Sequence, residues 1–361
     1  MGALQRVRSP RGVAVIGLAA LTAVVISAPW RVAPTGAQDT TTTVGATTTT
    51  TTSVTTTTAP IGAVTTPLPW PSKAGAAASI PQLSVVAAAP VQNRRPIASL
   101  TKMMTTWVVL HALPLSLGQS GPCVRVSRAD VKVYENDVNE GQSSIDVAVG
   151  ERLCESSLLR GMLVHSAGNF AVMLEEMMGV SGPAFVAMMN SDAKALGLTR
   201  THYVDATGID PRDTSTALDQ VTMVGDLMTA ESVVRADVRL LQVTLPVGGV
   251  QVSYTPYVGQ FGVVGVKSGY TIPAGGCDAM AVNFHVKGKL LTAYAVVLGV
   301  QGAEAIDRAG LDALGLARAL RRHVAAVTAN STTTLEWTGQ PGNVVATTTT
   351  TTVAPTTTTT G

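Results

Sequence analysis

Threonine-rich tracts near both ends confine the foldable part of this 361-residue chain to its middle. Threonine dominates residues 40–66, and the same composition returns from Thr347 to the end. Such segments bury too little apolar surface to offset the conformational entropy of folding, so we expect solvated tethers, either plain spacers or carriers of O-linked sugar. The predicted organisation is a linker over residues 38–69, a folded region over 70–327 and a disordered tail over 328–361.

The N-terminus has the pattern of an export signal. Arg6, Arg8 and Arg11 precede an uncharged, largely apolar run over residues 12–28, and small residues follow near position 37. Residues 1–37 are therefore predicted to be a cleaved signal peptide. The alternative is an uncleaved anchor, because a run of this length lies at the lower edge of what spans a bilayer. In both cases we expect an exported protein, with membrane attachment only through residues 12–28.

Composition limits the classes of protein that the chain can represent. It is 46% hydrophobic and 13% charged, which allows one large core or two smaller lobes. The net charge is +2, and no stretch after the N-terminal arginines concentrates lysine or arginine enough to bind phosphate backbones. We therefore expect no nucleic-acid partner.

The cysteines do not suggest a metal site. Cys123, Cys154 and Cys277 lack CxxC spacing and nearby histidines, so neither a metal nor a cofactor is predicted. Cys123 and Cys154 flank segments that could lie side by side and form a disulfide in an exported protein. Three free, buried cysteines are the alternative.

The hydrophobic pattern predicts helices in the middle of the folded region and strands toward its end. We expect a buried helix over 97–110 and a small β-rich patch over 124–149. Two further helices are predicted over 157–178 and 182–196. A meander of strands over 263–266, 279–285 and 290–300, followed by a helix over 304–327, completes a two-lobed α/β or α+β protein.

The sharpest chemical signal is Ser99-Leu100-Thr101-Lys102. A spacing of three on a helix places Ser99 and Lys102 on one face, about one turn apart. The lysine can accept the serine proton once burial and nearby cations lower its pKa. Ser99 also lies near a helix start after Pro96, where backbone N–H groups favour an oxyanion.

Two later segments add polar groups that could complete such a site. Ser166 falls between two apolar helical stretches and could relay a proton, with His165 as a wall of the site. Lys267-Ser268-Gly269 ends a strand, where a lysine, a hydroxyl and a residue without a side chain suit the binding of a substrate carboxylate along a strand edge.

The order and setting of these segments resemble the D-alanyl-D-alanine carboxypeptidases, which are low-molecular-mass penicillin-binding proteins with the motifs SxxK, SxN and KTG. The likeness extends over roughly residues 85–316 and is carried by segments 96–105, 201–210, 215–219 and 265–271. It implies an α+β fold of the β-lactamase/transpeptidase type. In that fold an antiparallel sheet flanked by helices meets a mainly helical subdomain, with the active site between them.

The resemblance also implies a role for each motif residue. Ser99 attacks the penultimate D-alanine carbonyl of a peptidoglycan stem peptide, Lys102 takes its proton, and Ser166 passes a proton to the leaving D-alanine. The backbone N–H groups of Ser99 and Tyr270 form the oxyanion hole. β-Lactam antibiotics are expected to acylate Ser99. The implied substrate-binding residues are Lys267, Ser268, Gly269, Tyr270 and Asn169.

The sequence departs from the family pattern at two positions. Ser268 replaces the usual threonine and keeps the hydroxyl. Gly168 stands where the family has asparagine, with Asn169 one place later. Either the carboxamide is lost, or the glycine lets the loop carry Asn169 into the same place, which is the outcome that we expect.

Two other functions share the same motifs. A β-lactamase needs a group for fast deacylation, and the glutamate pattern of its commonest form is missing between the second and third motifs. A non-catalytic wall-binding protein could retain the groove and lose turnover through Gly168, although the intact Ser99 and Lys102 argue against it.

Overall fold

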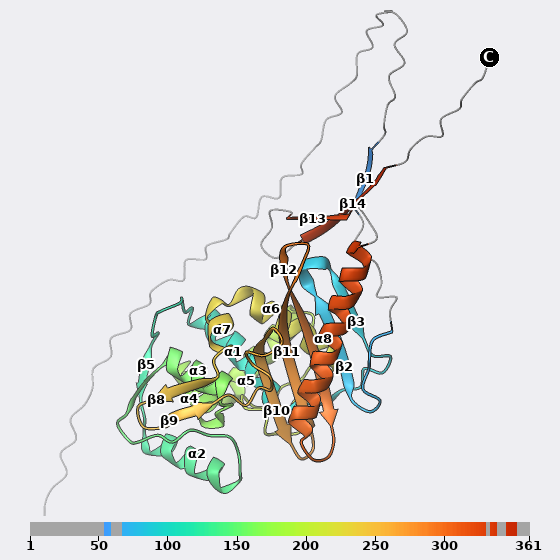
Figure 1. Cartoon of the computed structure of the whole chain (residues 1–361). Coiled ribbons are helices and arrows are strands. Elements are labelled where there is room, and N and C mark those ends of the chain that lie inside the picture. Colours follow the sequence, from blue (N-terminus) through green and yellow to red (C-terminus); the bar gives the residue numbers. More distant parts are fainter. Residues whose placement is uncertain (1–53, 59–66, 330–332, 338–343, 352–361) are drawn as a thin grey trace, which may run out of the picture. The chain divides into compact units, whose positions relative to one another are not determined.

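An antiparallel sheet of five strands, in the order β10-β11-β12-β2-β3, forms the centre of the fold (Figure 1). The computed structural model describes residues 54–58, 67–329, 333–337 and 344–351, so the predicted signal peptide lies outside the described residues. The strands of this sheet are β2 (Gly75–Ile80), β3 (Val85–Ala88), β10 (Val263–Thr271), β11 (Gly275–Val286) and β12 (Lys289–Val300). Strand β10 lies at one edge of the sheet.

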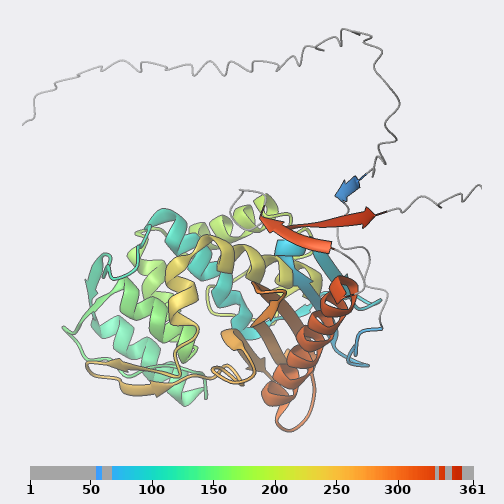
Figure 2. The ribbon, with the colours of Figure 1, turned by 45° about the horizontal axis from the view of Figure 1, so that its top comes forward.

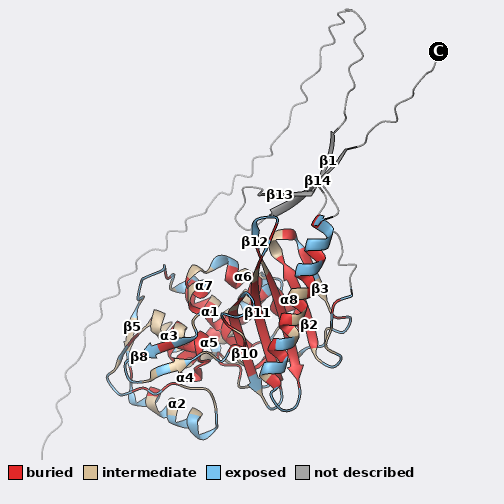
Figure 3. Cartoon of the chain, viewed as in Figure 1, coloured by how far each residue is buried: buried red, intermediate tan, exposed pale blue. Residues whose placement is uncertain are grey.

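The sheet is buried on both faces. Along β12, Val297 packs toward α8 (Ala305–Ala329), whereas its neighbour Val296 packs with the helices of the other face. Helix α6 (Ala217–Ala230) contacts β12 and β2. This burial accounts for the largely apolar sequences of β11 and β12, and Figure 3 colours most of both strands as buried.

The remaining helices gather beside the sheet (Figure 2). Helices α1, α3, α4 and α5 share one hydrophobic core with α6, in which Phe170 and Phe185 are fully buried. In the described part of the chain, no single helix is long and apolar enough to cross a membrane. The bounds are α1 (Thr101–Ala112), α2 (Arg128–Asn139), α3 (Glu155–Val164), α4 (Gly168–Met177), α5 (Gly182–Ala195) and α7 (Ser232–Asp237).

The predicted β-rich patch over 124–149 is largely wrong. Residues 128–139 form α2, because Ser127 and Asp130 make a capping box: the serine hydroxyl accepts two backbone N–H groups and the Asp130 carboxylate accepts that of Ser127. Only the first few residues of the patch form a strand, β5 (Cys123–Arg125), which pairs with β6 (Arg152–Cys154). Two other short pairs are β8 (Gln242–Leu245) with β9 (Gly249–Val252), and β4 (Arg95–Pro96) with β7 (Thr214–Ser215).

Two predicted helices have different bounds in the structure. The helix expected over 157–178 divides into α3 and α4, because the chain turns at Ser166, which adopts a positive φ of 65°. The helix expected over 97–110 begins as the 3₁₀ turn η2 (Ala98–Leu100) and becomes α-helical at Thr101. The predicted strands of the meander and the C-terminal helix are present and longer than expected.

The threonine-rich segments also differ from the expectation of disorder. Strand β1 (Val54–Thr58) pairs with β14 (Val344–Thr351), which pairs with β13 (Thr333–Trp337). Threonine is β-branched and has a high strand propensity, which accounts for the pairing. Within the ranges predicted as tethers, residues 54–58, 333–337 and 344–351 therefore form strands.

A disulfide joins Cys123 and Cys154 where β5 and β6 pair, and Cys277 is free and buried. This confirms the oxidised alternative. The bridge closes a loop with a sequence separation of 31.

Reduction of this disulfide is expected to lower the free energy of unfolding by about 3–4 kcal/mol, since a cross-link of this loop length restricts the unfolded chain. Urea unfolding with and without a thiol reductant measures the difference. The same comparison on the variant Cys123→Ser/Cys154→Ser is the control, because it has no bridge to reduce. An unchanged midpoint for the wild type would contradict a stabilising role.

Candidate active site

Ser99 lies in the 3₁₀ turn η2, directly before α1, and Lys102 lies in the first turn of α1. The Lys102 Nζ donates hydrogen bonds to Ser99 Oγ at 2.9 Å and to the Thr207 carbonyl oxygen at 2.7 Å. The structure therefore brings together the serine and lysine that the sequence singled out. The second bond, which Lys102 donates to Thr207 in a loop far along the chain, anchors the lysine.

Burial shapes the acidity of Lys102. The side chain is almost fully buried, and desolvation lowers its pKa to about 8. The carboxylates of Asp205, Asp137 and Asp213 oppose this change, because they stabilise the ammonium form. A lysine with this pKa exchanges its proton near neutral pH, which suits a general base.

A loop between α5 and α6 holds the other side of Lys102. The Asp205 carboxylate accepts backbone N–H groups from Thr207, Gly208 and Asp210, and this fixes the Thr207 carbonyl that receives the lysine. Gly208 has a φ of +84°, and a Cβ there would lie 1.9 Å from the Ala98 carbonyl oxygen. Glycine is therefore required where the loop crosses the residue before Ser99.

Strand β10 carries Lys267-Ser268-Gly269 past the same serine. An ideal Cβ on Gly269 would lie 2.7 Å from the Ser99 backbone nitrogen, so the strand can approach the nucleophile only with glycine at this position. Ser268 Oγ donates to the Tyr254 carbonyl oxygen at 2.8 Å. The structure places the predicted third motif directly against the nucleophile segment.

Lys267 is fully buried, and its Nζ donates to the Ser268 carbonyl oxygen at 2.6 Å. Burial lowers the pKa of Lys267 well below its ordinary value, the Lys102 charge lowers it further, and Asp278 on β11 opposes both effects. An incoming carboxylate would favour the charged lysine, so binding of an anion and protonation of Lys267 are coupled.

Ser166 lies on the other side of a small cavity from β10. This cavity has a volume of about 260 Å³ and is lined by Ser166, Tyr254, Ser268, Gly269 and Tyr270, together with Gly141, Gln142, Ser143 and Ile306. The His165 ring packs on Tyr254 with centroids 4.3 Å apart and bonds the Val252 carbonyl oxygen, as expected of a wall. The cavity joins the second and third motifs.

Asn169 is not brought to this cavity, contrary to our expectation. Its Oδ1 accepts the backbone N–H of Ile145 at 3.1 Å, and its Nδ2 donates to the Ile145 carbonyl oxygen at 2.8 Å. The side chain is 1% exposed, with both polar atoms in use. Asn169 therefore anchors the segment that follows α2, and the glycine does not carry it into the place of the missing carboxamide.

No sequence pattern indicates Asp137, whose carboxylate lies beside Gly168. It projects from α2, and its charge is among those that act on the pKa of Lys102. Because the sequence predicts a β-rich patch over 124–149 and no helix there, it does not place this carboxylate near the site. The residues three and four positions away from Asp137 form no recognisable motif with it.

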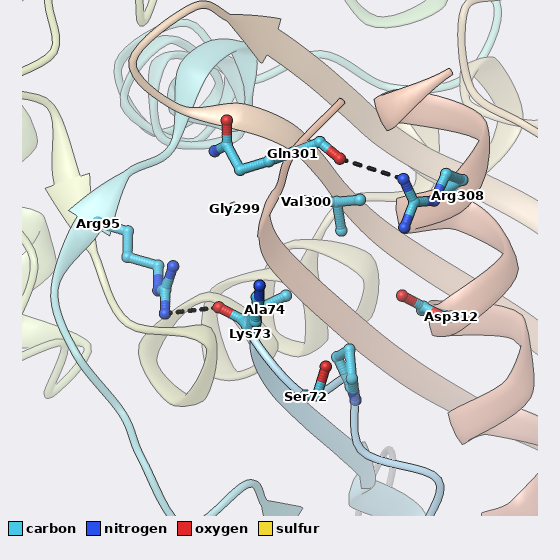
Figure 4. Close-up of a pocket in the computed structure, with 10 residues that line it drawn as sticks. Ser72, Lys73, Ala74, Arg95, Gly299, Val300, Gln301, Arg308 and Asp312 are labelled. Carbon is cyan, nitrogen blue, oxygen red and sulfur yellow. Dashed lines mark hydrogen bonds between the residues drawn. The ribbon is translucent and has the colours of Figure 1, made fainter. Parts of the chain in front are cut away.

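A second cavity, of about 500 Å³, contains none of the motif residues (Figure 4). Arg95 Nη2 donates to the Lys73 carbonyl oxygen there, and Arg308 Nη1 donates to that of Gln301. Among the described residues, no group of three or more His, Cys, Asp or Glu side chains could hold a metal ion.

The peptidase family described as D-alanyl-D-alanine carboxypeptidase matches residues 81–302, which is more than half of the chain. This chain belongs to that family. The match contains the serine–lysine pair, Ser166 and the β10 motif, and it confirms the resemblance inferred from the motifs.

Solved structures confirm the predicted fold of this peptidase. The DD-transpeptidase of Streptomyces K15 superposes with a TM-score of 0.61 at 22% identity, covering 70% of this chain and all (100%) of that one. A D-alanyl-D-alanine carboxypeptidase from Mycobacterium tuberculosis gives a TM-score of 0.59 at 22% identity, covering 74% and 95%. The β-lactamase/transpeptidase-like α+β class is therefore correct.

Curated relatives cover less of the peptidase. DacD, a D-alanyl-D-alanine carboxypeptidase of Salmonella typhimurium, is 38% identical over 129 residues, which are 36% of this chain and 33% of that protein. A D-alanyl-D-alanine endopeptidase of Escherichia coli is 28% identical over 206 residues, 54% and 61% of the two chains. The chain spans about a third of the length of the first of these relatives.

Proposed function

We propose that the protein is a serine-type D-alanyl-D-alanine carboxypeptidase, which removes the terminal D-alanine from peptidoglycan stem pentapeptides and is inhibited by β-lactams. The observation that carries the proposal is the hydrogen bond of 2.9 Å between the buried Lys102 Nζ and Ser99 Oγ, beside an edge strand that carries a lysine and a hydroxyl. The family membership of the chain supports the same reaction.

In the proposed reaction, Ser99 Oγ attacks the penultimate D-alanine carbonyl as its proton moves to Lys102 Nζ. The peptide lies along the free edge of β10 and extends the sheet by one strand. The N–H groups of Ser99 and Tyr270 stabilise the oxyanion, and Ser166 relays a proton to the departing amine. Water then attacks the acyl-enzyme and releases the shortened peptide.

The proposed cellular location is outside the cytoplasm, at the cell wall or in the envelope. The disulfide between Cys123 and Cys154 supports it, because such bonds persist in oxidising compartments. The family acts on the cell wall, which is also extracytoplasmic. Export through residues 1–37 remains part of the proposal.

The substrate carboxylate is expected to bind above Lys267 and Ser268. The wild type should hydrolyse a pentapeptide ending in free D-alanyl-D-alanine at least about tenfold faster, in kcat/KM, than the same peptide with an amidated terminus, because a charge-assisted hydrogen bond is lost. Release of D-alanine or its amide measures both reactions.

The variant Lys267→Met keeps most of the side-chain volume and removes the charge, so it should lose the preference for the acid. Lys289→Met, at an exposed position on β12, is the matched control and should keep it. Equal turnover of acid and amide by the wild type would reject the proposed role of the third motif.

A further inference from the structure

A carboxylate occupies the space next to Gly168, where the family has asparagine. An ideal Cβ on Gly168 would lie 3.2 Å from Asp137 Oδ2 and 3.4 Å from the Ser143 carbonyl oxygen. Gly168 is the first residue of α4 and is not among the residues with positive φ. It is therefore the Asp137 carboxylate, and not a strained backbone, that leaves little room for a side chain at position 168.

Asp137 has a fixed backbone and an uncommitted oxygen. Helix α2 is held by its capping box, and the Asp137 carbonyl oxygen accepts the Gln142 N–H at 2.7 Å where the chain leaves the helix. Within the described residues, no donor bonds Asp137 Oδ2, although this oxygen is buried. Buried polar atoms without a partner are rare in folded proteins, so this oxygen requires an explanation.

Asp137 differs from the other carboxylates that act on Lys102 in its hydrogen bonds. Three carboxylates act on the lysine, from Asp137 on α2 and from Asp205 and Asp213 on the loop after α5, while Lys267 on β10 is the nearby cation. Both oxygens of Asp205 accept loop N–H groups. Those of Asp213 accept the Val204 N–H and the Thr101 hydroxyl. Of the three, Asp137 alone keeps a buried oxygen without a partner in the described part of the chain.

We propose that Asp137 is a positioning residue for Lys102, and that its carboxylate takes the place of the side chain that Gly168 lacks. The inference rests on the proposed function, because it gives Lys102 the role of base. As Ser99 Oγ bonds the carbonyl carbon, the hydroxyl proton moves to Lys102 Nζ, and the Asp137 carboxylate stabilises the resulting ammonium ion without taking the proton. The proton later leaves with the amine.

A structural role is the alternative explanation for Asp137. The backbone N–H of Asn169, in the first turn of α4, also stabilises its ionised form, so the carboxylate could serve only as a helix cap. Burial raises the pKa of Asp137, the Lys102 charge and the Asn169 N–H lower it, and Glu140 raises it. The two roles predict different effects of a side chain at position 168 on the acylation of Ser99.

A double-mutant cycle separates them. The readout is the second-order rate constant for acylation of Ser99 by a fluorescent penicillin in four proteins: wild type, Asp137→Ala, Gly168→Asn and the double variant. We expect each single change to slow acylation by about tenfold, and the double variant to recover most of that loss, since neighbouring sites that share a space are coupled. An asparagine at position 168 collides with the Asp137 carboxylate in the single variant. In the double variant the carboxylate is absent, and the asparagine fills its place.

The opposite pattern would overturn the inference. If Asp137 only caps α4, Asp137→Ala should lower Tm and leave the acylation rate of the folded protein unchanged, and Gly168→Asn should bring no rescue. If the wild type itself is not acylated at Ser99, the proposed function fails. If the wild type is acylated but the effects of Asp137→Ala and Gly168→Asn are not coupled, only the inference about Asp137 fails.

The pH profile gives a second readout that a cap would not move. Asp137→Asn preserves shape and removes a negative charge beside Lys102, so the pKa of the lysine, about 8 in the wild type, should fall further. Acylation requires the neutral lysine. The acid limb of the curve of acylation rate against pH should therefore move to lower pH in Asp137→Asn. Glu135→Gln, at an exposed position on the same helix, should leave the profile unchanged. Coincident wild-type and Asp137→Asn profiles would reject the inference.

Discussion

Replacing Lys102 with alanine is expected to slow acylation of Ser99 by roughly a hundredfold to ten-thousandfold, the range typical of a general base. The lysine is the group that bonds Ser99 Oγ, at 2.9 Å. Without it the serine proton has no acceptor of suitable pKa at that distance among the described residues. The rate of labelling by a fluorescent penicillin, compared with wild type at one pH, measures the effect.

The fold should largely survive this change. Burial of the Lys102 charge is itself unfavourable, as its lowered pKa shows, and the surrounding carboxylates keep their bonds to the loop. Circular dichroism of the variant checks this point. Lys132→Ala, at an exposed position on α2, is the matched control and should acylate at the wild-type rate. A Lys102→Ala protein that acylates normally would exclude the lysine as base.

Gly269→Ala is expected to abolish most acylation through geometry alone. The new methyl group would lie 2.7 Å from the Ser99 nitrogen and 3.1 Å from the Ala98 Cβ, and the first of these neighbours is backbone that cannot rotate away. Either β10 or the nucleophile turn must move, and a shift of about 1 Å can cost about a hundredfold in rate. Overpacking should also lower the free energy of unfolding by about 1–3 kcal/mol.

The matched control is Gly315→Ala on α8. An ideal Cβ there has no neighbour within 4 Å, and the residue lies inside a helix, so alanine should stabilise the protein by about 0.5–1 kcal/mol and leave acylation unchanged. Acylation rate and urea unfolding are measured for both variants. Wild-type acylation by Gly269→Ala would show that β10 does not approach Ser99 this closely.

The parts of the fold that could be predicted are those with long apolar segments. The buried strands β11 and β12 are largely apolar, and α8 carries apolar residues at helical spacing. Ser99 and Lys102 could be paired because both lie on one turn of chain. Lys267 could be singled out as a carboxylate-binding group at the end of a strand, but only the family resemblance indicated that β10 passes the nucleophile.

The failures have local causes. The alternating runs at 124–126 and 145–149 favour strands and hide helix α2 between them, although Ser127 and Asp130 at a spacing of three signal a capping box. Asn169 is expected at the site because it directly follows the position where the family has asparagine, and the sequence does not indicate which groups its side chain bonds. Its two bonds to Ile145 depend on a segment 24 residues away. Asp137 could not be found for the same reason, since a carboxylate on a polar helix gives no sign that it packs beside Gly168 and acts on the charge of Lys102.

The central claim is that Ser99 is the nucleophile of a penicillin-sensitive peptidase. Its most direct test is incubation of the purified protein with a penicillin, followed by mass mapping of the covalent adduct. We predict one adduct per chain, on the peptide that contains Ser99, and none in Ser99→Ala. An adduct on Ser166, or no adduct on folded wild-type protein, would contradict the claim.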